Sequence, residues 1–188
     1  MGIAINKSFP GLLLCLLHLL FLSSCKEVSF PQPQPAGISA LKEVPAALRG
    51  EYKAGDAQNP DADTLIIESW GYHFRDGKDN DWLGKGVLSD SLVVKFYQNY
   101  YFVNFRSGTQ WVLRLIRQKP SGALEFLSID LSDDEKTREM LKKLSKKTSV
   151  KEVHGNEETY YQINPSRDQL MQLIREGYFT GAELTRIK

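Results

Sequence analysis

The stretch SLVVKFYQNYYFVNFRSGTQWVLRLIRQKPSGALEFLSIDL, residues 91–131, decides the fold class. Its β-branched and aromatic residues recur with a period of two, which is typical of half-buried β-strands. The breaks between these runs are short: Gln98-Asn99, Ser107-Gly108 and residues 119–122. Turns this short join only antiparallel neighbours. The stretch therefore predicts an antiparallel meander of at least four strands.

The sequence outside the meander predicts further strands and two helices. Strand-like patterns cover residues 65–74, with Gly71 as a bulge, and residues 157–163 and 179–187. Helical patterns cover residues 132–147, with Ser132 as N-cap, and residues 164–177, with Gly177 as the stop. The fold class is therefore mainly β, or β-rich α+β. We expect a barrel or sandwich of about eight strands with two short helices.

The first 24 residues have the pattern of a targeting segment. Lys7 supplies a positive charge, and an uninterrupted apolar run covers residues 12–22. A membrane-spanning helix needs about 20 apolar residues, and this run is about half that length. We therefore expect a signal peptide over residues 1–24 and a mature chain that begins at Cys25.

Leu22-Ser23-Ser24-Cys25 resembles the lipobox of bacterial lipoproteins. The resemblance implies that Cys25 is acylated, that the peptide is cut just before it, and that the membrane is the partner of the acylated residue. Lys26 follows the cysteine, which in the lipoprotein family favours the outer membrane, with a periplasmic or surface location. Two or three acyl chains on one cysteine give stable attachment, whereas a single chain holds only marginally.

The segment after the anchor contains the run FPQPQPAG, which lacks apolar periodicity. Alternating proline and glutamine favour an extended chain of the polyproline type. We therefore expect residues 25–45 to form the lipidated cysteine and a Pro-rich tether, and residues 46–188 to form a single β-rich domain.

Composition excludes several classes of function. The signal segment carries one of the 24 basic residues and none of the 23 acidic ones, so the mature chain has no net charge. A general nucleic-acid binder would show a basic excess, and we expect no nucleic-acid partner. Of the two cysteines, Cys15 leaves with the signal and Cys25 carries lipid. No thiol then remains for a disulfide, a zinc site or a nucleophile.

The entry to the predicted domain resembles a second family. Arg49-Gly50-Glu51-Tyr52 is similar to the Gly-x-Trp opening of lipocalins, with Tyr52 in the place of the tryptophan. The resemblance implies a lipocalin-like β-barrel. A helix after the main meander is compatible with that family.

The acidic loop RDGKDNDWLGKG contains the candidate metal ligands Asp76, Asp79 and Asp81. Their carboxylates are hard oxygen ligands of the kind that Ca²⁺ prefers. The spacing does not match an EF-hand, however, and aspartate caps of tight β-turns explain the same residues. We expect no cofactor.

Aromatic side chains cluster in the meander and give the best candidate binding surface. Alternation places Tyr101, Val103 and Phe105 on one face and Phe102, Asn104 and Arg106 on the other. One face must fill the core, while the other could contact a ligand or partner. The candidate residues for this surface are Tyr97, Tyr101, Phe102, Phe105 and Trp111.

These observations favour a non-enzymatic, lipid-anchored domain of the cell envelope that binds a small apolar ligand or a partner protein. His73 and His154 lie far apart, and no Gly-x-Ser-x-Gly turn accompanies a serine, so no catalytic set emerges. A structural accessory subunit of an envelope complex is the first alternative. A carboxylate-based envelope hydrolase is the second, since 23 acidic residues always permit some pair.

Overall fold

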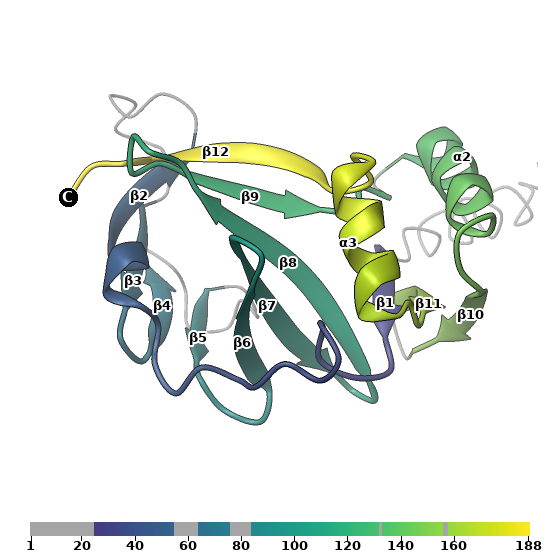
Figure 1. Ribbon diagram of the computed structural model, residues 1–188, viewed down its shortest axis with the longest axis horizontal. Coiled ribbons are helices and arrows are strands. Elements are labelled where there is room, and N and C mark those ends of the chain that lie inside the picture. The colour runs from purple at the N-terminus through teal and green to yellow at the C-terminus, as the bar shows by residue number, and fades with distance from the viewer. Residues whose placement is uncertain (1–24, 55–63, 76–83, 132, 156–157) are drawn as a thin grey trace, which may run out of the picture.

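The computed structural model describes residues 25–54, 64–75, 84–131, 133–155 and 158–188. The described chain is mainly β, with twelve strands in one branched, mixed sheet and two α-helices (Figure 1). The predicted fold class is confirmed, although the strands are more numerous than the eight or so expected. Within the described residues, no helix combines the length and the apolar character that crossing a membrane requires.

The predicted meander is present as four consecutive antiparallel strands. They are β6 (Leu92–Tyr97), β7 (Tyr100–Ser107), β8 (Gln110–Gln118) and β9 (Leu124–Ser128). Gln98 and Asn99 both have positive φ, 46° and 67°, as a two-residue hairpin turn with the twist of its strands requires. The short breaks in the sequence therefore located these hairpins correctly.

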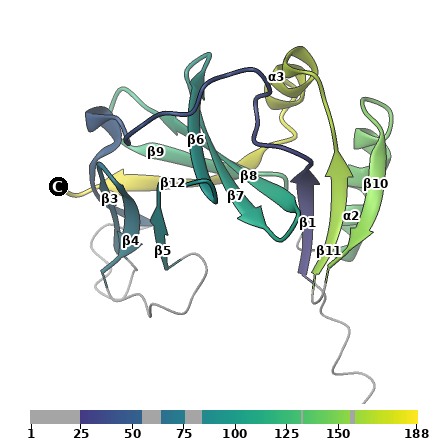
Figure 2. The same cartoon turned by 90° about the horizontal axis from the view of Figure 1, so that it is seen from below.

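The sheet branches at β8. One edge of β8 pairs with β7, while the other edge is shared by β9 and by β1 (Cys25–Phe30). One branch continues from β1 to β11 and β10, and the other continues from β9 through β12, β2, β3 and β4 to β5 (Figures 1 and 2). The remaining strands are β2 (Gly50–Ala54), β3 (Thr64–Glu68), β4 (Gly71–Phe74), β5 (Lys85–Val87), β10 (Val150–His154), β11 (Glu158–Ile163) and β12 (Thr180–Arg186).

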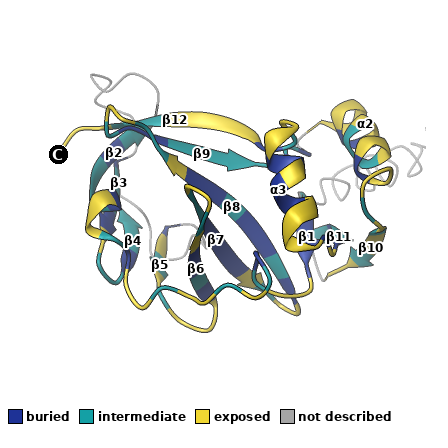
Figure 3. Cartoon of the chain, viewed as in Figure 1, coloured by how far each residue is buried: buried dark blue, intermediate teal, exposed yellow. Residues whose placement is uncertain are grey.

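Two apolar cores lie on opposite faces of β7 and β8. The helix-side core packs those strands, β1 and β11 against α2 (Asp134–Leu144) and α3 (Arg167–Arg175), and it contains Phe102, Leu115 and Leu173. The barrel-side core lies between β6–β8 and the curved branch of β2–β4, and it contains Tyr52, Val103 and Phe105. Buried residues accordingly concentrate on β7, β8 and the sheet-facing side of α3 (Figure 3).

Of the predicted helix ends, the structure confirms the stop at Gly177. α3 begins after Ser166 and not at residue 164, and α2 ends at Leu144 and not at residue 147. Ser166 caps α3 in a capping box with Gln169, and Gly177 at φ +78° terminates it. The amides of Gly177 and Tyr178 donate to the carbonyls of Ile174 and Leu173, which is a Schellman motif. Asp133 caps α2, because its side chain accepts hydrogen bonds from the backbone amides of Glu135 and Lys136. The predicted cap Ser132 lies outside the described residues.

The structure differs from the predicted tether. Residues 26–30 belong to β1, in which Val28, Ser29 and Phe30 are buried. Residues 31–45, here called the strap, cross the outside of β6 and β7 before reaching the short 3₁₀ turn at Ala46–Leu48 (Figure 1). The domain therefore begins at β1, well before residue 46.

Polar contacts to the proline-rich backbone hold the strap in place. The Asn104 side chain accepts from the amide of Gln34 at 2.6 Å and donates to its carbonyl at 2.9 Å. The buried Lys95 ammonium donates to the carbonyls of Pro33 and Pro35, and burial lowers its pKa. Proline has no amide hydrogen to donate but keeps its carbonyl oxygen. A Pro-rich segment such as the strap is therefore held by donors that bind its carbonyl groups. The amide of Leu41 then donates to Val94 on the edge of β6.

Residues 65–74 form a hairpin and not the single strand that the pattern predicted. β3 and β4 pair antiparallel around a turn at Ser69-Trp70. Gly71 is the first residue of β4, at φ +152°, and a Cβ there would lie 1.9 Å from the carbonyl oxygen of Gly86 on β5. Glycine therefore allows β4 and β5 to approach closely.

Candidate functional site

An apolar cavity of about 180 Å³, partly open to solvent, lies in the barrel-side core. The strap, the 3₁₀ turn and six strands contribute to its wall. All of the side chains on that wall are aliphatic or aromatic, and Gly71 contributes backbone. The lining residues are Val44, Leu48, Leu65, Ile67, Gly71, Tyr72, Phe74, Leu88, Leu92, Val94, Val103, Phe105, Ile116 and Phe126.

Strand alternation brings the cavity wall together. Val103 and Phe105 on β7 lie two residues apart, as do the wall residues of β6 and of β3, so each pair points to the same side of its strand. The curved branch of the sheet carries the β3 pair around to face β6 and β7 (Figure 2). The Tyr72 and Phe105 rings meet edge to face, with centroids 6.3 Å apart, and stiffen one side of the wall.

The cavity suits a compact apolar molecule. Its lining, over the described residues, includes no carboxylate, amine, guanidinium or imidazole group, and Tyr72 is its only residue with a polar side chain. An apolar cavity of about 150 Å³ in another protein stays dry and binds benzene, so the present volume is sufficient for a ligand of that size. A charged molecule would lose its hydration without gaining a partner.

The predicted aromatic residues divide between the two cores. Phe105 lines the cavity, and Tyr101 packs against the same core. Phe102 is fully buried in the helix-side core, against which Tyr97 and Trp111 also pack. The Arg167 guanidinium of α3 lies 5.2 Å from the centre of the Tyr97 ring. Of the five candidates, the structure therefore brings only Phe105 to the cavity wall.

A second, polar pocket of about 570 Å³ lies where the β7–β8 turn faces β10 and β11. The Ser107 and Tyr160 hydroxyls are 2.7 Å apart, and the Tyr160 hydroxyl also donates to Glu158. Gln110, nearby on the wall, accepts from Ser29 and Gln162. These polar side chains form hydrogen bonds with one another. We therefore interpret the pocket as a polar surface whose hydrogen bonds hold the neighbouring strands together.

The candidate metal ligands cannot be located in the described part of the chain, whereas His73 and His154 can. Asp76, Asp79 and Asp81 lie outside the described residues. Over the described ranges, no group of three His, Cys, Asp or Glu side chains is placed to hold a metal ion. His73 stacks on Trp70 at 5.8 Å, whereas His154 is exposed at the end of β10.

Sequence reasoning missed most of the cavity wall, because several of its residues come from segments assigned to other roles. Val44 belongs to the predicted tether, and Leu65 and Ile67 belong to a strand whose partner was not specified. The period-two spacing of Leu65 and Ile67 was the available signal for an inward face. The sequence could not show that β3 faces β6 and β7, because the pairing of β9, β12, β2 and β3 that brings them together joins segments far apart in the chain.

No family model, no curated protein and no solved structure matches this chain.

Proposed function

We propose that this chain is a lipid-anchored protein of the cell envelope whose β-domain binds a small apolar ligand without catalysing a reaction. The anchor is the acylated Cys25, and the outer membrane is the proposed location. The ligand site is the cavity of the barrel-side core.

The apolar cavity is the observation that carries the binding proposal. Close-packed interiors leave few voids larger than a water molecule, and removing contacts around a void costs stability. The cavity of about 180 Å³ is partly open, so its aliphatic and aromatic wall leaves apolar surface uncovered that an apolar ligand would bury. The β-rich fold supports a binding role because its strands hold both walls in place.

The proposed affinity is modest because the ligand is small. The best small ligands gain at most about 1.5 kcal/mol per non-hydrogen atom, and most gain less. A benzene-sized ligand that gains about 5 kcal/mol would bind with a dissociation constant on the order of 0.2 mM.

Cavity-filling substitutions test the binding site. We expect toluene or indole to raise the melting temperature of the protein and to shift the NMR signals of the wall. Val103→Phe places a ring in the cavity from β7, and Ile67→Phe places one from β3. Both variants should keep the fold, as judged by circular dichroism, and lose the response to the probe.

Val87→Phe is the matched control, since Val87 is 51% exposed and lies outside the cavity wall. It should respond to the probe as the unmodified protein does. The binding proposal fails if neither probe binds, or if both filled variants bind with unchanged affinity. Native mass spectrometry of the purified protein should in addition detect a co-purifying apolar ligand.

Substitution of each of the two cysteines in turn tests the proposed anchor. Cys25→Ala should release the protein from the membrane fraction, and mass spectrometry of the N-terminal peptide should show acyl chains only when Cys25 is present. Cys15→Ala changes the other cysteine, within the proposed signal, and should leave attachment intact. Membrane attachment of Cys25→Ala would contradict the anchor.

The accessory-subunit alternative makes a different prediction. A structural subunit should be recovered from the membrane with a stoichiometric protein partner, whether or not the cavity is filled. Pull-down of Val103→Phe distinguishes the two functions, because ligand binding should be lost while a structural partner should be retained.

A further inference from the structure

The first residue of the proposed mature chain is also the first residue of a strand inside the sheet. Cys25 pairs in register with Glu158 of β11, and Lys26 pairs with Thr159. Further along β1, Ser29 and Phe30 pair with Val112 and Trp111 of β8. The end of β1 thus lies between β11 and β8, whereas its start pairs with β11 alone, and no residue separates Cys25 from this strand.

Side-chain contacts hold β1 on both faces. On the helix side, Lys26 forms an ion pair with Asp134 at the start of α2, and this hydrogen bond raises the pKa of the Lys26 ammonium. On the other face, both carboxylate oxygens of Glu27 accept from the Arg114 guanidinium, at 2.5 and 3.2 Å. The start of β1 is therefore joined to the domain by main-chain pairing with β11 and by side-chain contacts on both of its faces.

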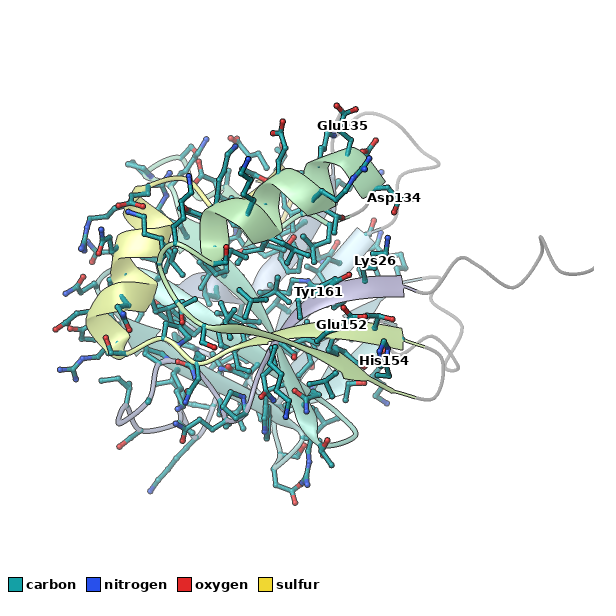
Figure 4. All side chains as sticks on the ribbon, turned by 90° about the vertical axis from the view of Figure 1, so that its right-hand side faces the viewer. Lys26, Asp134, Glu135, Glu152, His154 and Tyr161 are labelled. Atoms are coloured by element: carbon teal, nitrogen blue, oxygen red, sulfur yellow. The ribbon has the colours of Figure 1, made fainter. Side chains whose placement is uncertain are left out.

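The direction of β1 defines one end of the molecule. β11 runs parallel to β1 and starts at the same end, and β10 is antiparallel to β11 and finishes there. The ion pair with Lys26 places the start of α2 at this end as well. We call this the anchor end and define it by Cys25, Asp134, His154 and Glu158. Figure 4 shows Lys26, Asp134 and His154 gathered there.

We propose that the bilayer surface contacts the anchor end directly, so that the domain is held in one orientation and does not swing on a tether. The inference rests on the proposed acylation of Cys25. Acyl chains attached to the first residue of a packed strand can enter the bilayer only if the neighbouring residues of the anchor end reach the headgroups. The last turn of α2, which carries Lys142 and Lys143, then points away from the membrane.

The charge of the anchor end indicates what kind of membrane contact this is. Acidic and basic groups are both present there, since Asp133 and Asp134 interact with Lys136 and Arg138, and Lys26 is already paired with Asp134. Anionic lipids attract basic segments and not acidic ones. The acyl anchor therefore imposes the contact, and zwitterionic phosphatidylcholine is sufficient for it.

Single-site labelling of the full-length, processed protein tests the orientation. The processed chain has no free thiol on the proposed anchoring, so one introduced cysteine can carry a fluorophore. His154→Cys labels the anchor end, and Lys146→Cys labels the exposed region after α2. The proteins are placed in phosphatidylcholine nanodiscs that contain a headgroup-quencher lipid.

We expect several-fold stronger quenching at position 154 than at position 146, because α2 has 11 residues and spans about 16 Å. A second pair of labelled proteins carries a 12-residue Gly/Ser linker directly after Cys25. Such a linker has an average reach of about 20 Å. Membrane attachment should persist in these proteins, while the difference in quenching between the two positions should largely disappear.

Two results overturn the orientation alone: equal quenching at the two positions in an acylated protein, or a difference that the linker leaves unchanged. Loss of attachment together with an unmodified Cys25 peptide in mass spectrometry overturns the proposed anchor and the orientation with it. Replacing part of the phosphatidylcholine by phosphatidylglycerol should not increase quenching at position 154. An increase would assign the contact to charge and contradict the proposed geometry.

Discussion

Asn104 shows how one buried polar side chain can fix a long segment of chain. It is fully buried, and its amide bonds to both backbone groups of Gln34, which lies 70 residues earlier. Lys95 adds contacts to the two prolines that flank Gln34. A buried amide or carbonyl without a partner costs about 1–3 kcal/mol, so these contacts determine whether the strap can be buried at all.

We expect Asn104→Ala to lower the free energy of unfolding by about 3 kcal/mol, since it leaves the amide and carbonyl of Gln34 without their partner. Urea unfolding followed by circular dichroism measures the change. Lys142→Ala, on the exposed side of α2, is the control and should change stability by less than about 0.5 kcal/mol. Equal stability of the two variants would show that the strap contact contributes nothing.

The residue pattern predicted the faces of β7 correctly but not their surroundings. Tyr101, Val103 and Phe105 face one core and Phe102 the other, as alternation requires. The pattern could not show that both faces are buried, because the covering layers come from α3 and from the distant strands β2–β4. The role of Asn104 could not be predicted either. It binds backbone groups of Gln34, and every residue has such groups, so the sequence does not indicate the partner.

Charged side chains connect β8, β9 and β12 across their shared surface. Glu125 on β9 accepts from Arg117 at 2.7 Å, and Lys119 contacts both Glu125 and Glu183. Burial by itself raises the pKa of the Glu125 carboxyl, but hydrogen bonds from Arg117 and Lys119 outweigh this and hold the pKa below its ordinary value of 4.5. The ionised form of Glu125 is therefore favoured in the folded protein.

This pKa shift gives the stability a defined dependence on pH. Because the folded pKa is lowered, the contribution is complete above about pH 4.5 and is lost as the pH falls through the folded pKa. We expect Glu125→Gln to remove this part of the acid sensitivity. The change should be no more than about 1 kcal/mol, because water screens pairs that are partly exposed. Urea titrations between about pH 6 and about pH 3 measure it.

Glu139→Gln is the control for the acid titration, since Glu139 is exposed on α2 and lies 3.8 Å from Lys143. It should leave the pH dependence of unfolding unchanged. Identical acid curves for the native protein and Glu125→Gln would exclude the carboxylate as a source of the pH dependence.

At the level of elements, sequence reasoning succeeded where partners are close in the chain. The hairpins of β6–β9 follow from local alternation and short turns. β1 was missed because its partners β8 and β11 lie far along the chain, and because the prolines that follow it favour an extended tether. An extended chain and a β-strand have similar backbone angles, so only the partners distinguish them.

The stability of the whole domain depends on β1 and the strap, the first segments that the structure describes. β1 is the link between β8 and the pair of β11 and β10, and the strap covers the edge and outer face of β6 and β7. Without β1, the helix-side core loses Val28 and Phe30, and β11 loses one of its two neighbours. Burying each of those side chains contributes about 1.5–3 kcal/mol.

We expect a fragment of residues 26–188 to unfold cooperatively and a fragment of residues 46–188 to show no cooperative transition. The loss includes two large core side chains, a strand ladder and the strap, which together approach a typical total stability of about 5–15 kcal/mol. Thermal melts followed by near-ultraviolet circular dichroism compare the two fragments. If the two fragments melted at the same temperature, residues 26–45 would contribute nothing to stability and would be a tether.

The central position of β1 also imposes an order in time. During synthesis β1 emerges before β8 and β11, which lie later in the chain. On the proposed anchoring, cleavage and acylation take place on an open strand, before its neighbours close around it. Pairings between distant segments form slowly, which lengthens this interval. A strand whose start is already paired with β11 would be a poor substrate for both enzymes, so the proposed anchoring requires acylation before folding.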